Sequence, residues 1–198
     1  MSKFDAAAAA PELAVPLLRL AAEDENDTSA TLASLRPAGG VLVVDVWTTR
    51  CERCPAALDK IEKLAAAEAG LSPEAAAAPG RVPVAYASVC AGLEVDMAEE
   101  LVEEGEWDHI SHTYAEPDAK AALKAAWGFK AVPFVAVVDV SGKVVATGSP
   151  AKMDLPALVL QASSAVPEPV PVPEPVLEEP AAEPAARPAL SFGMDDDF

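Results

Sequence analysis

The stretch "VVDVWTTRCERCPAALDKIEKLA", residues 43–65, joins an apolar segment to two closely spaced cysteines and then to a helical pattern. The run "VLVVDV" (41–46) is rich in β-branched residues, which is typical of a strand that is buried on both faces. After Cys54, apolar side chains recur every three or four residues as far as Gly70, and this spacing predicts an amphipathic helix. We therefore expect the two cysteines at the junction between a central strand and a helix.

The rest of the chain supplies further strands and helices around this junction. A second strand is predicted at 81–89, and residues 132–148 predict a hairpin with a tight turn at Ser141-Gly142. Residues 24–30 are interpreted as a polar connection, and His109 and His112 are expected in a loop. These elements predict an α/β fold in which a central mixed sheet has helices on both faces. Helices are expected at 93–107, 118–129 and 154–165, with a short one within 11–23.

The composition divides the chain into three parts. Residues 1–27 are interpreted as an N-terminal extension, and residues 28–165 as one domain. Residues 166–198 contain eight prolines, with eight acidic residues against one arginine. Such a segment cannot bury a core, so an extended tail rich in proline and acidic residues is predicted there.

The overall charge excludes several classes of partner. The formal net charge is −18, whereas nucleic-acid binding needs clustered Lys and Arg, and anionic membrane surfaces also attract basic segments. No apolar run reaches the roughly 18 residues that a membrane span requires. The start of the chain is acidic and resembles neither a secretory signal nor a transit peptide. We therefore expect a cytoplasmic protein that binds neither nucleic acid nor membranes.

The spacing of Cys51 and Cys54 favours redox chemistry or a metal site. Cys51 is expected at the start of the helix, where free N–H groups and the helix dipole favour a thiolate. Cys54, three residues later, could then attack a mixed disulfide and release the partner. Cys51 is thus the expected nucleophile and Cys54 the resolving thiol. A Cys₂His₂ metal set with His109 and His112 is the alternative, but two surface histidines in a loop are expected instead, with no metal and no bound cofactor.

The order of elements, the C-x-x-C at a strand-to-helix junction and "AVPF" (131–134) before the hairpin resemble the thioredoxin fold. The resemblance covers roughly residues 28–162. The segment "TLASLRPAGGVLVVDVWTTRC" (31–51) is similar to the beginning of the TlpA-like and nucleoredoxin-like branch of the thioredoxin-like superfamily.

This resemblance implies roles for further residues. Asp45 interrupts an apolar strand and matches the buried acid that takes a proton from the resolving cysteine; an acid at a strand edge is the alternative. Pro133 matches the cis-proline of the fold, and the backbone of Val132 would pair with an extended peptide of the partner. The resemblance favours a position for Trp47 on the rim of the site, with a position in the core as the alternative. Cys90 is expected to be a buried apolar cysteine, with a regulatory thiol as the alternative.

The sequence departs from the family around the dithiol. The family usually has Trp immediately before the first cysteine and often Gly-Pro between the two, whereas here the run is "RCER". Arg50 and Arg53 should favour the Cys51 thiolate, and Glu52 should oppose it. Arg50 is therefore a candidate substrate-binding residue, and the charged rim indicates partners other than those of a general-purpose thioredoxin.

Two functions follow from these features. The first is a thiol–disulfide oxidoreductase or redox sensor that acts on a protein partner through Cys51 and Cys54. The second is a thioredoxin-fold structural or adaptor subunit of a large assembly, anchored by residues 166–198, with redox activity secondary or absent. Ciliary and axonemal complexes are examples of such assemblies, which would give a ciliary or cytoskeletal location.

Overall fold

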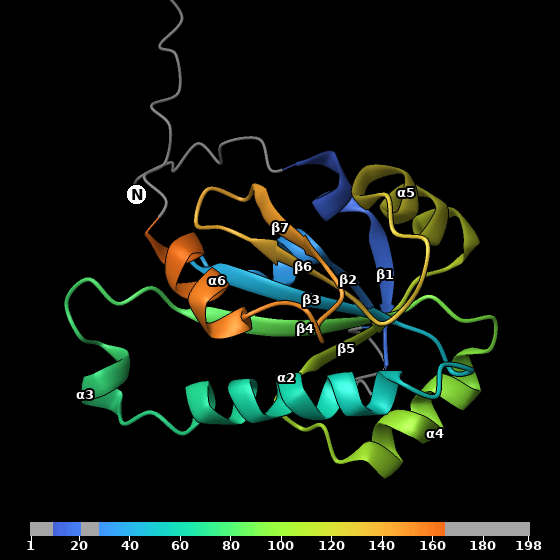
Figure 1. Ribbon diagram of the computed structural model, residues 1–198, viewed down its shortest axis with the longest axis horizontal. Helices are drawn as coiled ribbons and strands as arrows, with labels where there is room; N and C mark the ends of the chain where they lie inside the picture. The colour runs from blue at the N-terminus through green and yellow to red at the C-terminus, as the bar shows by residue number, and fades with distance from the viewer. Residues whose placement is uncertain (1–9, 21–27, 165–198) are drawn as a thin grey trace, which may run out of the picture. The chain divides into compact units, whose positions relative to one another are not determined.

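The computed structural model describes residues 10–20 and 28–164. Its centre is β3 (Val41–Trp47), the apolar run of the quoted stretch, and every residue of this strand is buried. The strand pairs in parallel with β4 (Val84–Cys90) and antiparallel with β6 (Phe134–Val138). Burial on both faces explains why the run is apolar almost throughout (Figure 1).

Seven strands form one mixed sheet in the described part of the chain, in the order β2-β1-β5-β4-β3-β6-β7. The three neighbours β3, β4 and β5 run parallel, and the other pairs are antiparallel. The predicted α/β architecture is therefore confirmed. The remaining strands are β1 (Pro16–Arg19), β2 (Ser29–Thr31), β5 (Ser111–Tyr114) and β7 (Val144–Gly148).

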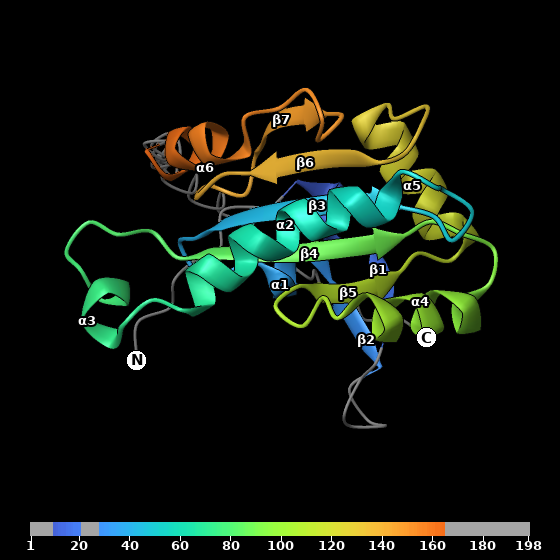
Figure 2. The same cartoon turned by 60° about the horizontal axis from the view of Figure 1, so that its bottom comes forward.

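Helices cover both faces of the sheet, and we name the faces by their main helices (Figures 1 and 2). On the α2 face, α2 (Cys54–Ala69), α4 (Val95–Gly105) and α6 (Leu155–Ser163) pack on the sheet. On the α5 face, η1 (Pro11–Ala14), α1 (Leu32–Leu35) and α5 (Pro117–Trp127) do so. The one-turn helix α3 (Pro73–Ala76) lies in the connection between α2 and β4. None of the helices in the described ranges is long and apolar enough to cross a membrane.

The predicted hairpin is present as β6 and β7. Asp139 Oδ1 accepts hydrogen bonds from the backbone N–H groups of Ser141 (2.8 Å) and Lys143 (3.0 Å). Gly142 has a φ of 84°, a conformation that glycine adopts without strain. The turn residues therefore set the connection between the two strands.

The prediction of a short helix within residues 11–23 is wrong after the first turn. A single 3₁₀ turn, η1, is followed by β1, which pairs with β2 and β5. Pro16 disfavours a continuing helix, whereas a proline is tolerated as the first residue of a strand. Part of the predicted N-terminal extension therefore belongs to the sheet.

Two stretches expected to be irregular form strands. The strand β2 begins at Ser29, within the predicted polar connection 24–30, and β5 carries His112 of the predicted loop. Both strands are short and rich in polar residues, so they carry no apolar alternation that would reveal them. The proline- and acid-rich tail predicted at 166–198 lies outside the described residues.

Candidate active site

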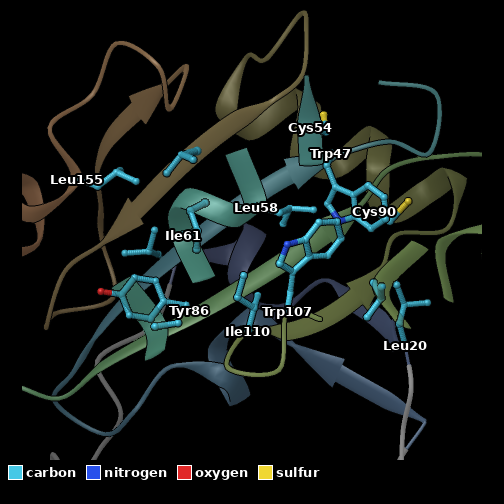
Figure 3. Close-up of a cluster of buried hydrophobic side chains, with 14 of the residues drawn as sticks. Leu20, Trp47, Cys54, Leu58, Ile61, Tyr86, Cys90, Trp107, Ile110 and Leu155 are labelled. Atoms are coloured by element: carbon cyan, nitrogen blue, oxygen red, sulfur yellow. The ribbon is translucent and has the colours of Figure 1, made fainter. Parts of the chain in front are cut away.

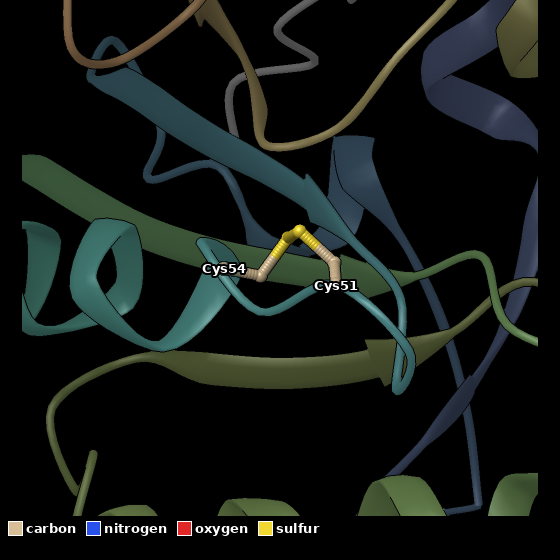
Figure 4. Close-up of a disulfide and its surroundings, with 2 residues drawn as sticks. All are labelled: Cys51 and Cys54. Carbon is tan, nitrogen blue, oxygen red and sulfur yellow. A yellow bond between two sulfur atoms is a disulfide. The ribbon is translucent and has the colours of Figure 1, made fainter.

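The two cysteines lie where β3 ends and α2 begins, and they form a disulfide (Figure 4). Their Cα atoms are 5.4 Å apart, within the usual range for a disulfide. The Cys51 N–H donates to Thr48 O (3.1 Å), and the Cys54 N–H donates to Cys51 O (3.0 Å). The helix starts at Cys54, so Cys51 occupies the turn that leads into the N-terminus of α2.

The two sulfurs differ sharply in exposure. Cys54 is fully buried, whereas Cys51 is partly exposed and lines a cleft of about 410 Å³. Arg50, Arg53 and Val132 line the same cleft. A disulfide of another protein can therefore reach Cys51, while Cys54 is accessible only from within this chain.

Asp45 lies in the core of the sheet. The pleat of β3 places it on the α2 face, together with Val43 and Trp47. Since β3 has a neighbour on each side, the alternative of an acid at a strand edge is wrong. The carboxyl is fully buried and neither oxygen has a hydrogen-bond partner. Burial raises the pKa of Asp45 well above its ordinary value.

Two more buried polar side chains share this face with Asp45. Ser88 on β4 is the register partner of Asp45, and His112 on β5 is the register partner of Ser88. Ser88 Oγ and His112 Nδ1 are 2.7 Å apart, and His112 Nε2 lies 2.8 Å from Trp107 O. Burial lowers the pKa of His112. The prediction of His112 as a surface residue is therefore wrong, because a buried serine and a buried carbonyl satisfy its ring nitrogens.

Trp47 belongs to the core and not to an exposed rim. It is 2% exposed, and its Nε1–H donates to Ser88 Oγ over 3.3 Å. Trp47 and Trp107 both line a pocket of about 250 Å³ that also reaches Cys51. Figure 3 shows both indoles within the cluster of buried side chains on the α2 face. Trp47 therefore approaches the dithiol from inside the protein. The expectation that it rims the site is corrected, because the indole fills the α2-face core.

The segment before β5 is fastened to α2 by two side-chain contacts. Trp107 Nε1–H donates to Asp59 Oδ1 (2.8 Å), and His109 Nδ1 lies 2.5 Å from Glu62 Oε1. His109 is exposed, as expected. In the ranges that the structure describes, no group of three or more His, Cys, Asp or Glu side chains could hold a metal ion. The Cys₂His₂ alternative therefore has no geometric support.

The Val132–Pro133 peptide bond is cis, in agreement with the resemblance. Both residues line a cleft of about 540 Å³ beside the dithiol. The cleft has an apolar floor and three cationic side chains, Arg53, Lys60 and Lys152, with no acidic residue in its lining. Sequence reasoning missed Lys60 and Lys152, since they come from α2 and from the turn before α6 and meet only in the fold.

The remaining candidates have simple environments. Arg50 is exposed and forms a salt bridge with Glu94, in which 3.7 Å separate Arg50 Nη2 from Glu94 Oε1 and both side chains contact solvent. Cys90 is a buried free thiol at the end of β4, as expected, and burial raises its pKa. Trp127 is buried at the end of α5.

No protein-family model matches the sequence, and no curated protein matches it. Solved structures do match. A secreted Mycobacterium tuberculosis disulfide oxidoreductase homologous to E. coli DsbE has a TM-score of 0.54 and 17% identity, covering 79% of this chain and 100% of that one.

Two further structures agree with this match. The thioredoxin domain of a thiol-disulfide oxidoreductase from Bacteroides vulgatus has a TM-score of 0.55 and 16% identity, covering 75% of this chain and 91% of that one. A thioredoxin-like protein from Porphyromonas gingivalis has a TM-score of 0.51 and 18% identity, covering 76% and 87%. The thioredoxin fold that the sequence resemblance predicts is therefore confirmed.

Proposed function

We propose that this protein exchanges thiols and disulfides with a protein partner through Cys51 and Cys54. The observation that carries the proposal is the asymmetric dithiol: Cys51 is accessible, Cys54 is buried, and the buried carboxyl of Asp45 lies on the same face of the sheet. The structurally similar proteins include disulfide oxidoreductases, which supports the same reading.

The reaction proceeds from the reduced form in two exchanges. The Cys51 thiolate attacks one sulfur of the partner's disulfide, forms a mixed disulfide and releases the other sulfur as a thiolate. Cys54 then gives up its proton and attacks the Cys51 sulfur, which forms the disulfide of the present structure and releases the reduced partner. The partner gains two electrons and this protein loses two. Asp45 is the proposed acceptor of the Cys54 proton.

The surroundings of Cys51 indicate the kind of segment that docks. Val132 lines both the cleft at Cys51 and the larger cleft, and so does Arg53, so the two clefts adjoin. The protein as a whole is strongly acidic, yet Arg53, Lys60 and Lys152 line the larger cleft without an acidic neighbour in that lining. We therefore propose an extended, acidic segment of the partner as the substrate, with apolar side chains on the apolar floor.

A trapping experiment tests the proposal. The Cys54→Ser variant cannot resolve the mixed disulfide, so incubation with a disulfide-containing protein such as insulin should accumulate an adduct on Cys51, measured by mass spectrometry. Cys51→Ser should form none. The control is Cys90→Ser, which removes a buried thiol outside the dithiol and should leave reduction of insulin unchanged. If wild-type protein reduces insulin no faster than Cys51→Ser does, the proposal is wrong.

The second candidate function, a subunit anchored in a larger assembly, is favoured by the composition of residues 166–198. Its test is independent of the dithiol. A chain that ends at residue 165 should no longer co-purify with its assembly, while its melting temperature stays the same. Unchanged co-purification of the shortened chain would exclude this role for the segment.

A further inference from the structure

The buried polar side chains of the α2 face form one row across the three parallel strands. Asp45, Ser88 and His112 are successive register partners on β3, β4 and β5. Their exposed fractions are 0%, 0% and 9%. Cys54 packs in the same cluster. Three polar groups in a row inside a core are costly unless they interact, so the row calls for a physical explanation.

The hydrogen bonds of the row have a definite direction. A carbonyl can only accept, so His112 Nε2 carries a proton and donates it to Trp107 O. His112 Nδ1 then has a free lone pair, and the Ser88 hydroxyl donates its proton to it. Trp47 Nε1–H occupies one lone pair of Ser88 Oγ. A hydroxyl has two lone pairs, so one is left to accept a hydrogen bond.

Asp45 is the group that can use this remaining lone pair. Neighbouring strands lie about 4.8 Å apart, so a register partner on the same face is within reach of a small side-chain rotation. In the disulfide form no hydrogen bond joins Asp45 to Ser88, and both carboxyl oxygens are without a partner. Rotation would let a protonated Asp45 donate to Ser88 Oγ, which completes a chain of hydrogen bonds from Asp45 to His112.

We propose that Ser88 and His112 are positioning residues that let Asp45 ionise inside the core. The Asp45 O–H bond breaks as its proton passes to Ser88 Oγ, while the proton of the Ser88 hydroxyl passes to His112 Nδ1. The number of protons in the row is unchanged. Afterwards Nδ1–H donates to Ser88 Oγ and the Ser88 hydroxyl donates to one oxygen of the Asp45 carboxylate, so the anion gains a hydrogen bond that the carboxyl lacks in the disulfide form.

The groups around the row are compatible with a charge on His112. Burial lowers the pKa of His112, whereas Glu62 on α2 and Asp108 before β5 favour the protonated ring, and Trp107 O accepts from Nε2–H in either state. The remaining titratable side chains of the α2-face cluster, among the described residues, are Cys54, Cys90, Tyr86 and Tyr114. None of these is a cation that would oppose the imidazolium.

The consequence for the dithiol rests on the proposed function. An ionised Asp45 can accept the proton of the Cys54 thiol: the S–H bond breaks, an O–H bond forms on Asp45, and the Cys54 thiolate is free to attack. A protonated Asp45 cannot do so. The hydrogen bonds of the row would therefore let Asp45 act as a base at pH values at which burial alone keeps its carboxyl protonated.

The test is a titration of the full-length reduced protein by NMR, observing the Asp45 carboxyl carbon. Ser88→Ala removes the hydroxyl that donates to the carboxylate, and should raise the Asp45 midpoint by about one pH unit or more. The matched control is Thr113→Val, because Thr113 is a buried hydroxyl on the opposite face of β5 that donates to Ser88 O. It should leave the midpoint unchanged. Equal midpoints in wild type, Ser88→Ala and Thr113→Val would overturn the proposal.

A second measurement follows the other end of the row. In Asp45→Asn the carboxylate no longer stabilises the imidazolium, so the ¹⁵N signals of His112 should report protonation only at a lower pH than in wild type. An unchanged His112 midpoint would also contradict the proposal. Neither titration requires turnover. A protein that fails the insulin test can still show the coupling, and an active protein can lack it, so the two proposals fail separately.

Discussion

The two faces of β3 use the same backbone for different purposes. On the α5 face, Leu42, Val44 and Val46 are fully buried, and the adjacent strands present only apolar residues to them, namely Ala87, Val89, Ala136 and Val138. On the α2 face, the same strand carries Asp45, beside Ser88 and His112. A strand alternates its side chains, so one sequence run can supply a fully apolar face and a face with buried polar groups.

The difference between the faces is energetic. Apolar burial on the α5 face stabilises the fold by roughly 25 cal/mol per Å² removed from water. Asp45 on the α2 face has the opposite effect, because a buried carboxyl without a hydrogen bond costs free energy. Substitutions on the α5 face should therefore change the free energy of unfolding alone. Substitutions at Asp45 should slow thiol–disulfide exchange while they stabilise the fold.

The largest effect is expected on exchange at Asp45. Asp45→Asn keeps the shape of the side chain but cannot accept the Cys54 proton, so release of the mixed disulfide should slow on the order of a hundredfold at neutral pH. The measurement is the lifetime of the Cys51 adduct after rapid mixing with a disulfide peptide. Formation of the adduct is the internal control, since it depends on Cys51 and should change little. An unchanged lifetime would show that Asp45 has no part in resolution.

The α5-face counterpart is Leu42→Ala. Leu42 is fully buried, and its truncation should lower the free energy of unfolding by about 2–5 kcal/mol through lost burial and a cavity. The lifetime of the adduct should match wild type at a temperature where the variant is folded. Urea unfolding followed by circular dichroism gives the first value, and rapid mixing gives the second. A longer lifetime of the adduct in Leu42→Ala than in wild type would show that the α5 face also affects exchange, which would contradict the division between the two faces.

The quoted stretch could predict much of this arrangement. Its β-branched run predicts a strand buried on both faces, and the cysteine spacing predicts a dithiol at the start of a helix; both are present. The cis bond before Pro133 also agrees with the resemblance. These features depend on residues close in sequence, or on a motif that the fold shares.

The polar row could not be predicted in the same way. Its members come from three strands, and the one that carries His112 is four residues long with no apolar alternation. From the sequence alone His112 is predicted to be a surface residue. Only the fold shows that Ser88 Oγ and Trp107 O lie within hydrogen-bond distance of its ring nitrogens. The position of Trp47 in the core could not be predicted for a related reason, because only the packing of α2 and α4 shows that the indole fills the core.

The pH dependence of stability sharpens the comparison further. Burial raises the pKa of Asp45 above its ordinary 3.8. Below that pH both the folded and the unfolded states hold the proton. As the pH rises, the unfolded carboxyl ionises first, so the free energy of unfolding should fall by about 1.4 kcal/mol per pH unit until the folded-state pKa is reached.

Asp45→Asn does not titrate at this position, so it should gain stability relative to wild type as the pH rises above about 4. The measurement is urea unfolding of both disulfide-bonded proteins at a series of pH values. Leu42→Ala provides the control, because its deficit relative to wild type should be the same at every pH. A wild-type stability that rises relative to Asp45→Asn over this range would mean that the carboxyl is stabilised as an anion in the folded state.

The smallest effect is expected at the cleft of about 540 Å³ that Val132 and Pro133 line. Lys152→Glu reverses one of its charges, and should weaken reaction with a disulfide peptide flanked by Asp and Glu by about two- to fivefold. Lys124→Glu is the matched control, since it makes the same change in net charge on the exposed surface of α5. The measurement is kcat/KM for acidic and lysine-flanked peptides at low salt and at about 1 M salt, where screening should abolish the difference. A preference for the acidic peptide that is the same in both variants would remove the charge argument for the cleft. The apolar floor of the cleft would then remain as the proposed contact with the partner.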